Sequence, residues 1–212
     1  MVEKAGAAGR PVITAAILQL GLLAQTILEA ERTVGYSIGI DPTMFLPQPS
    51  PGWMFILVSL VLSVLAIVNF ILLMVWLFKA TRLIGRRVTP ALTISPGWAI
   101  GCWFIPVVNF VAPFLVMTEL YNASRVPENW NKRGLPILAI LWWGATFLGV
   151  MVALAIRFGR HLSFELPPQD TMYAGLYGFG TLRLLSLLAL VTAITRFQKS
   201  AAAVESGVET IF

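Results

Sequence analysis

Residues 95–124 read SPGWAIGCWFIPVVNFVAPFLVMTELYNAS, and the path of this stretch decides the fold. No residue from 96 to 118 carries a charge, so the segment is apolar enough for the hydrocarbon core of a bilayer. Pro106 and Pro113 interrupt it. A proline inside a helix removes a backbone hydrogen bond, clashes with the preceding turn and pushes the residue before it out of helical geometry. The segment therefore predicts a helix that is broken near Pro106.

The break at Pro106 predicts two half-helices. Ser95 and Pro96 form a start signal, because serine accepts free N–H groups and proline loses nothing at the first helical position. Residues 96–105 then make a half-helix of about 15 Å, which reaches the middle of a hydrocarbon core of about 30 Å. Asn109 is expected to cap the second half, which returns to Ser124. Backbone groups freed at that depth require partners inside the protein.

The composition of the whole chain indicates an integral membrane protein. It is 58% hydrophobic and 12% charged, with a mean hydropathy of +0.81, whereas soluble domains carry about 25% charged residues. The net charge is +5, but the basic residues stand at the ends of apolar runs, as membrane topology requires, so a nucleic-acid partner is not expected. The single cysteine, Cys102, excludes an intramolecular disulfide and a cysteine-based metal cluster.

The uncharged runs divide the chain into spans of about the 20 residues that a membrane helix needs. The first run is long for a signal peptide and is followed by a poor cleavage site, so it is interpreted as a retained helix. The chain 1–212 is expected to form a single all-α membrane domain that ends in a cytoplasmic tail at 200–212. The predicted spans are residues 12–30, 53–78, 135–156 and 172–195.

The lysines and arginines favour one topology. If residues 96–118 return to the side from which they entered, the inner segments hold eleven basic residues and the outer loops hold only Arg32, Arg157 and Arg160. If the segment spans, the division is eight to six. Positive residues collect on the cytoplasmic side. The sequence therefore predicts four spans with a re-entrant or interfacial hairpin at 96–123 and both termini cytoplasmic. Five spans remain the alternative.

The central stretch resembles the signature of a bacterial membrane family known as domain of unknown function 4328. Cys102, Ala112 and Leu115 depart from that signature, which has a tryptophan, a basic residue and a glutamine there. The resemblance implies a helical protein of a bacterial inner membrane and no reaction. The residues that match are Pro96, Gly97, Trp98, Ala99, Gly101, Trp103, Phe104, Ile105, Pro106, Asn109, Pro113, Val116, Met117, Glu119, Ala123 and Ser124.

Arg183 is a charge inside the last apolar run, and intramembrane ionisable groups are functional candidates by default. Its structural interpretation is that it extends toward the outer interface or pairs with Glu29 or Glu31. His161, the only histidine, stands beside Arg160. It is interpreted as an interfacial residue, with an axial ligand to a pigment or haem held together with another chain as the alternative.

The remaining polar and aromatic candidates lie within the apolar segments. Asn109 is placed where two half-helix ends present opposite partial charges, a layout that transporters use for ions. Trp98 and Trp103 are the aromatic binding candidates of the same segment. Glu119 is expected to act as an anchor that faces the basic linker 79–87. Polar residues within the spans are expected to join helices: Gln19, Gln25 and Asn69.

No catalytic or metal-binding constellation is found in the sequence, and no cofactor is predicted beyond a bound lipid or quinone. The leading hypothesis is a non-enzymatic inner-membrane protein that acts as an accessory or assembly subunit of a larger complex, with the bilayer and other membrane subunits as partners. The alternative is a small transporter or a lipid- or quinone-binding protein that uses the 96–124 hairpin.

Overall fold

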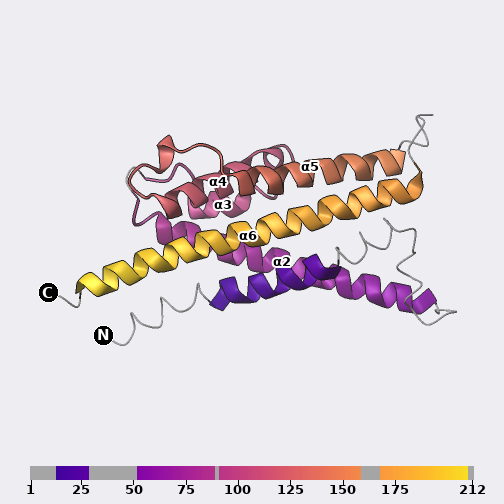
Figure 1. The fold of residues 1–212 in the computed structure, drawn as a ribbon, viewed down its shortest axis with the longest axis horizontal. Coiled ribbons are helices and arrows are strands. Elements are labelled where there is room, and N and C mark those ends of the chain that lie inside the picture. The colour runs from indigo at the N-terminus through magenta and orange to yellow at the C-terminus, as the bar shows by residue number, and fades with distance from the viewer. Residues whose placement is uncertain (1–12, 29–51, 89–90, 159–167, 210–212) are drawn as a thin grey trace. The chain divides into compact units, whose positions relative to one another are not determined.

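The computed structural model describes residues 13–28, 52–88, 91–158 and 168–209 (Figure 1). Within these ranges the regular structure is helical and no strand occurs. An N-terminal helix, Ile13–Leu28, precedes the labelled elements. These are α2 (Gly52–Ile84), α3 (Pro96–Gly101), the 3-10 helix η2 (Val108–Phe110), α4 (Ala112–Arg125), the 3-10 helix η3 (Trp130–Lys132), α5 (Ile137–Phe158) and α6 (Gln169–Glu209).

Three of the described helices are long and apolar enough to cross a membrane. The candidate spans are Ser63–Ile84, Ile137–Phe158 and Thr171–Ala201. The N-terminal helix is apolar but shorter, and its 16 described residues rise about 24 Å, less than the roughly 30 Å of a hydrocarbon core. The all-helical membrane architecture is therefore confirmed, whereas the span at 12–30 and the path of 96–123 stay predictions.

Two helices extend further than the uncharged runs predict. α2 runs to Ile84 instead of ending at 78, and α6 runs to Glu209 instead of ending at 195. Lysine and arginine are good helix formers, so a charge ends an apolar run without ending the helix. The described part of the predicted tail, 200–209, is consequently helical. α5 begins and ends within two residues of the predicted span 135–156.

The start of α3 is confirmed. The Ser95 Oγ accepts a hydrogen bond from the Trp98 N–H at 3.2 Å, and Pro96 occupies the first turn. The helix ends at Gly101, earlier than the predicted 105. The ring of Pro106 is incompatible with a helical carbonyl four residues earlier, at Cys102, which explains the early end. Trp103 and Phe104 instead donate to carbonyls three residues back, at 3.1 Å each.

The predicted capping role of Asn109 is wrong. Asn109 lies inside η2, where its N–H donates to the Ile105 carbonyl at 2.8 Å. The N-cap of α4 is Val111, which makes no side-chain capping bond, and Pro113 stands in the first turn. Proline has the helical φ and no N–H to satisfy, so Pro113 favours a helix start at Ala112 without a polar cap.

The chain forms two compact units. The described residues of the first unit are 13–20, 70–88, 91–140 and 188–209. Those of the second are 21–28, 52–69, 141–158 and 168–187. The N-terminal helix, α2, α5 and α6 each contribute residues to both units, whereas α3 and α4 belong entirely to the first.

The first unit packs around α4. Its largest fully buried side chains come from the N-terminal helix, α2, α4, α6 and Cys102, which follows α3. A buried Gln198 joins α2, α4 and α6. Gln198 Nε2 donates to Ser124 Oγ at 3.1 Å and to the Ala80 carbonyl at 3.4 Å. Tyr121 and Phe197 pack edge to face, with ring centroids 5.7 Å apart. The fully buried side chains include Leu77, Ile84, Met117, Leu120, Leu190 and Ile194.

Polar side chains tie the N-terminal helix to its neighbours, as predicted for Gln19, Gln25 and Asn69. In the first unit, Gln19 Nε2 donates to Thr192 Oγ1 at 3.2 Å. In the second unit, Asn69 Nδ2 donates to Gln25 Oε1 at 3.0 Å. Gly21 leaves room for the Asn69 amide, because a Cβ at Gly21 would lie 2.0 Å from Asn69 Oδ1. These helices therefore meet through a buried amide that requires a glycine opposite it.

Gly21→Ala is expected to destabilise the protein by about 1–3 kcal/mol, because the new methyl displaces the buried Asn69 amide from its hydrogen bond with Gln25. Gly144→Ala is the matched control, since among the described residues no atom lies within 4 Å of a Cβ at Gly144. Thermal unfolding of both variants in detergent tests this expectation. Equal melting temperatures for the two variants would contradict the packing described for Gly21.

Candidate functional site

The chain offers two candidate sites, one in each compact unit. The first is the 96–124 segment, which packs against the middle of α2. The Phe70 ring meets Trp103 at a centroid distance of 5.9 Å and Phe104 at 6.2 Å, both edge to face. Phe70 lies fourteen residues before Ile84, the last residue of α2, which corresponds to about 21 Å along the helix. The C-terminal end of α4 instead lies beside Ala80, because Gln198 of α6 donates hydrogen bonds both to Ser124 of α4 and to the Ala80 carbonyl.

Asn109, like Thr118 of α4, has a buried side-chain oxygen that makes no hydrogen bond with the described residues. Its Oδ1 atom is buried and accepts no hydrogen bond from the part of the chain that the structure describes. A buried carbonyl oxygen without a donor costs about 1–3 kcal/mol. Asn109 therefore places an available acceptor between the end of α3 and the start of α4.

Glu119 connects α4 to the residues that precede α3. Its two carboxylate oxygens accept hydrogen bonds from the Thr93 N–H and the Thr93 hydroxyl. The anchoring role predicted for Glu119 thus has a partner just beyond the basic linker 79–87, in the residues that lead into α3. Trp98 is exposed, while Trp103 lies against Phe70. The two aromatic candidates therefore do not form one stacked platform.

The residues that depart from the family signature have different environments. Cys102 is buried, and its Sγ lies 3.6 Å from the Ala99 carbonyl. Leu115 is exposed, and Ala112 is half-buried. An exposed leucine suits contact with lipid, whereas the family's glutamine at this position offers a hydrogen-bonding group. At position 102 a cysteine replaces the tryptophan of the signature, and this smaller buried side chain changes the packing next to α3.

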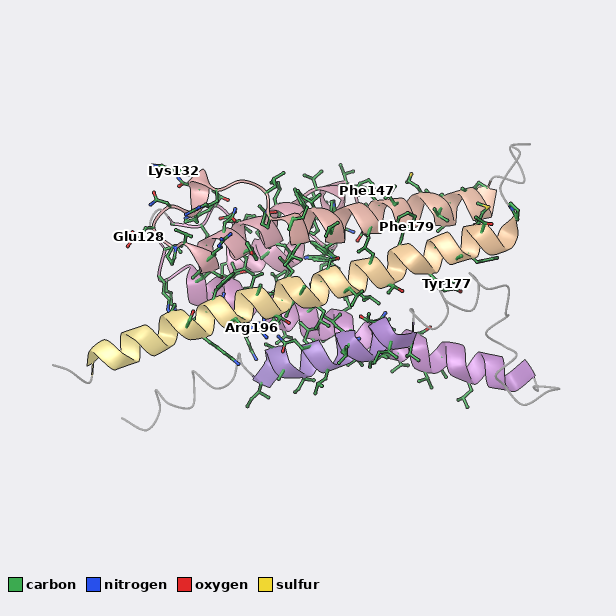
Figure 2. The ribbon with its side chains drawn as sticks, viewed as in Figure 1. Glu128, Lys132, Phe147, Tyr177, Phe179 and Arg196 are labelled. Atoms are coloured by element: carbon green, nitrogen blue, oxygen red, sulfur yellow. The ribbon has the colours of Figure 1, made fainter. Side chains whose placement is uncertain are left out.

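The second candidate site is a cavity of about 280 Å³ between α5 and α6. Small side chains leave this space open, and the helices touch where Gly149 meets Phe179, since a Cβ at Gly149 would lie 3.6 Å from Phe179 Cβ. Figure 2 shows Phe179 between the two helices. The cavity is lined by Ala145, Thr146, Gly149, Val150 and Ala153 of α5 and by Leu176, Tyr177, Phe179, Gly180 and Arg183 of α6.

Arg183 gives this cavity its charge. It lies twelve residues into the candidate span Thr171–Ala201, about 18 Å from the first residue of that span. The two hydroxyls on this part of α5 and α6 are used within their own helices: Thr146 Oγ1 donates to the Trp142 carbonyl at 2.8 Å and Thr181 Oγ1 to the Tyr177 carbonyl at 3.0 Å. The Arg183 guanidinium and the Tyr177 phenol also line the cavity, and both residues make interactions of their own.

The structure does not bring all the predicted site residues together. Asn109, Trp98 and Trp103 belong to the first unit, and Arg183 belongs to the second. His161 and the proposed arginine partners Glu29 and Glu31 lie outside the described residues. Among the described residues no group of three metal-binding side chains occurs. The sequence marked Arg183 as a candidate, but only the pairing of α5 with α6 places it beside Gly149 and Ala153 in a cavity.

The comparisons with known proteins support one assignment. The family model described as "Domain of unknown function (DUF4328)" matches residues 52–202. No curated protein and no solved structure matches the chain. The matched region includes α2 through the candidate span of α6, and with it the whole 96–124 segment that carries the resemblance. Because the match covers well over half of the 212 residues, the chain belongs to the DUF4328 family.

Proposed function

We propose that this protein is a non-enzymatic accessory or assembly subunit of a larger complex in the bacterial inner membrane. The observation that carries the proposal is the poor cover of α5. Only 17% of its apolar window is buried within the chain, against 39% for the windows of α2 and α6. The uncovered side chains include Ile137, Leu141, Leu148, Met151 and Phe158.

Gly144 favours a helix, and not lipid alone, as the occupant of this surface. It lies between Leu141 and Leu148 at three- and four-residue spacing, the pattern by which side chains of paired helices interdigitate. Among the described residues nothing lies within 4 Å of a Cβ at Gly144. Glycine at such a place lets two helix backbones approach closely within a membrane. The proposed occupant is one membrane-spanning helix of a different polypeptide.

Gly144→Leu is expected to remove the partner, because a bulky side chain holds the second helix away. The test is purification of the tagged protein from its host in a mild detergent, with quantitative mass spectrometry of the co-purified proteins. Gly175→Leu is the control, since Gly175 of α6 also has open space at its Cβ among the described residues.

We expect a stoichiometric partner with the wild type and with Gly175→Leu, and at least a fivefold loss with Gly144→Leu. A wild-type protein that purifies alone would contradict the subunit role. Equal recovery of the partner with both leucine variants would contradict the assignment of the interface to α5.

We further propose that the membrane topology has four spans, with 96–123 re-entrant and both termini cytoplasmic. The contacts of the first unit support this path. Trp103 packs against Phe70 in the middle of α2, while Ser124 lies at the Gln198 contact beside Ala80. The last residues of α2 and the first residues of α5 belong to the same compact unit as the segment between them.

Single cysteines introduced at Ala91 and Asn131 in a Cys102→Ser background are expected to react with an impermeant maleimide from the cytoplasmic side only. Both positions are exposed and flank the segment. Inside-out and right-side-out vesicles separate the two sides. Pro168→Cys and Ser200→Cys supply the outer and cytoplasmic references. Labelling of Ala91→Cys and Asn131→Cys from opposite sides would establish five spans instead.

A second candidate function is a small transporter or a lipid- or quinone-binding protein that uses the 96–124 segment. The observation in its favour is the buried Asn109 Oδ1, which accepts no hydrogen bond from the described residues. A ligand that donates a hydrogen bond, such as a reduced quinone, would satisfy this atom at the break between α3 and α4.

Asn109→Ala is expected to abolish thermal stabilisation by a short-chain quinol, because it removes the acceptor that the ligand would use. The measurement is the melting temperature in detergent with and without the quinol. Asn131→Ala, an exposed position outside the segment, is the control. The idea fails if the quinol does not stabilise the wild type, or if Asn109→Ala is stabilised equally.

A further inference from the structure

We propose that the outward face at the C-terminal end of α2 binds an acidic phospholipid, with its phosphate on Arg82 and Arg86 and an acyl chain along Ile71, Val75 and Phe78. These five residues, here called the α2 stripe, all belong to the first compact unit. The stripe lies on a different helix from the uncovered face of α5. The proposal therefore adds a ligand to the subunit role and does not depend on that role.

The α2 stripe is a row of exposed side chains at intervals of three or four residues. Such intervals place side chains on one face of a helix. Ile71, Val75 and Phe78 are 55%, 39% and 36% exposed, and Arg82 and Arg86 are also exposed. The stripe is thus apolar over its first part and basic over its second.

The stripe continues past the last helical residue of α2. Arg86 follows Ile84, where the helix ends, by two positions. The N–H groups of Gly85 and Val88 nevertheless donate to carbonyls four residues back, at 2.9 and 3.2 Å. The backbone therefore keeps a helical path through this turn and holds Arg86 about one turn beyond Arg82.

The order of side chains along the stripe matches one leaflet of a bilayer. Ile71 and Phe78 are seven residues apart, about 10 Å along the helix, and Arg82 follows Phe78 after a further 6 Å or about one turn. One leaflet contributes about half of a hydrocarbon core of roughly 30 Å. The apolar side chains consequently suit the depth of an acyl chain, and the arginines suit the level of the phosphates. A lipid contacts both parts of the stripe, whereas a free anion contacts only one.

The charge of the stripe has little compensation within the chain. α2 contains no acidic residue, and Glu119 of α4 already accepts hydrogen bonds from Thr93. The negative end of a helix dipole, about half an elementary charge, offsets only part of two arginine charges. The described part of the first unit holds nine basic residues and four acidic ones, which are Glu119, Glu128, Glu205 and Glu209.

Arg82 and Arg86 differ from the other two basic residues at this end of α2. The Lys79 Nζ donates to Thr14 Oγ1 at 2.9 Å, and Arg87 is half-buried and makes an interaction of its own. Two exposed arginines one turn apart repel each other. An anion that both guanidinium groups contact removes this repulsion.

The headgroup that suits this pair is an anionic phosphate. The planar fork of a guanidinium matches a phosphate with two parallel hydrogen bonds. Basic residues next to the hydrocarbon layer attract anionic lipids. A zwitterionic lipid carries its own positive charge, which leaves the repulsion between Arg82 and Arg86 in place. The geometry therefore favours an acidic phospholipid over a zwitterionic one.

The first test is the melting temperature of the full-length protein in dodecyl maltoside with dioleoyl phosphatidylglycerol, dioleoyl phosphatidylcholine or glycerol phosphate. A ligand that binds only the folded state raises the melting temperature. We expect phosphatidylglycerol to raise that of the wild type by several degrees and the other two probes to have little effect. The double variant Arg82→Gln with Arg86→Gln is expected to lose this response. The control, Lys132→Gln with Arg133→Gln, removes the same charge from two exposed residues at the end of η3 and is expected to retain it.

A second readout locates the lipid on the wild-type protein and does not depend on how any variant folds. Phosphatidylglycerol with a diazirine in its acyl chain is expected to crosslink to peptides that contain residues 71–78. We expect at least fivefold more of this product than with the matching phosphatidylcholine, because each basic residue near the headgroup favours the anionic lipid. A wild-type ratio near one would contradict the proposal.

Four further outcomes would overturn it. Equal stabilisation by phosphatidylcholine would remove the role of the net charge. Equal stabilisation by glycerol phosphate would indicate a site for a free anion. Equal loss in both double variants would indicate a general effect of charge and not a site on α2. Protein crosslinks in place of lipid crosslinks, from a photoreactive residue at Val75 in native membranes, would assign this face to a protein partner. Because Gly144→Leu tests the partner on α5 separately, failure of the subunit role and failure of the lipid site are distinguishable results.

Discussion

A proline inside an apolar segment removes a backbone donor and breaks the helix, and this constraint governs the centre of the structure. Pro106 lacks an N–H and prevents a helical carbonyl at Cys102, so the backbone between Gly101 and Ala112 must find other partners. Bonds to carbonyls three residues back and the turn at η2 satisfy much of it. Phe70 packs against Trp103 and Phe104 on one side of this irregular backbone, whereas Val107, Phe110 and Val111 are exposed.

The polar side chains of the two units have different surroundings. Gln198 and Glu119 hold the ends of α4 and the residues that lead into α3, and all their partners lie in the first unit. Arg183 instead faces a space that small residues keep open. A buried amide with defined partners rigidifies its surroundings. The buried contacts of the first unit therefore join α2, α4 and α6, whereas the second unit keeps an open space between α5 and α6.

Local rules made part of this fold predictable. The start of α3 at Ser95 and Pro96 depends only on adjacent residues, and the structure confirms it. The family resemblance rested on contiguous residues and is confirmed as well. Helix ends were less predictable. The hydrophobic runs end at Lys79 and Arg196, but α2 and α6 continue past these residues. The capping role of Asn109 failed because Pro113 starts α4 without a polar cap. The cavity could not be predicted, since it depends on which faces of α5 and α6 meet.

The candidate span of α6 is longer than the hydrocarbon core of a typical bilayer is thick. Its apolar span of 31 residues measures about 46 Å, against a hydrocarbon core of about 30 Å. Tilt alone within the usual range of about 0–40° does not absorb this hydrophobic mismatch, so part of the span must stand in the headgroup layer or the bilayer must thicken around it. Arg196 and Lys199 occupy the C-terminal part of the same helix. A thicker bilayer accommodates more of α6, so bilayer thickness sets how much of this helix enters the aqueous phase.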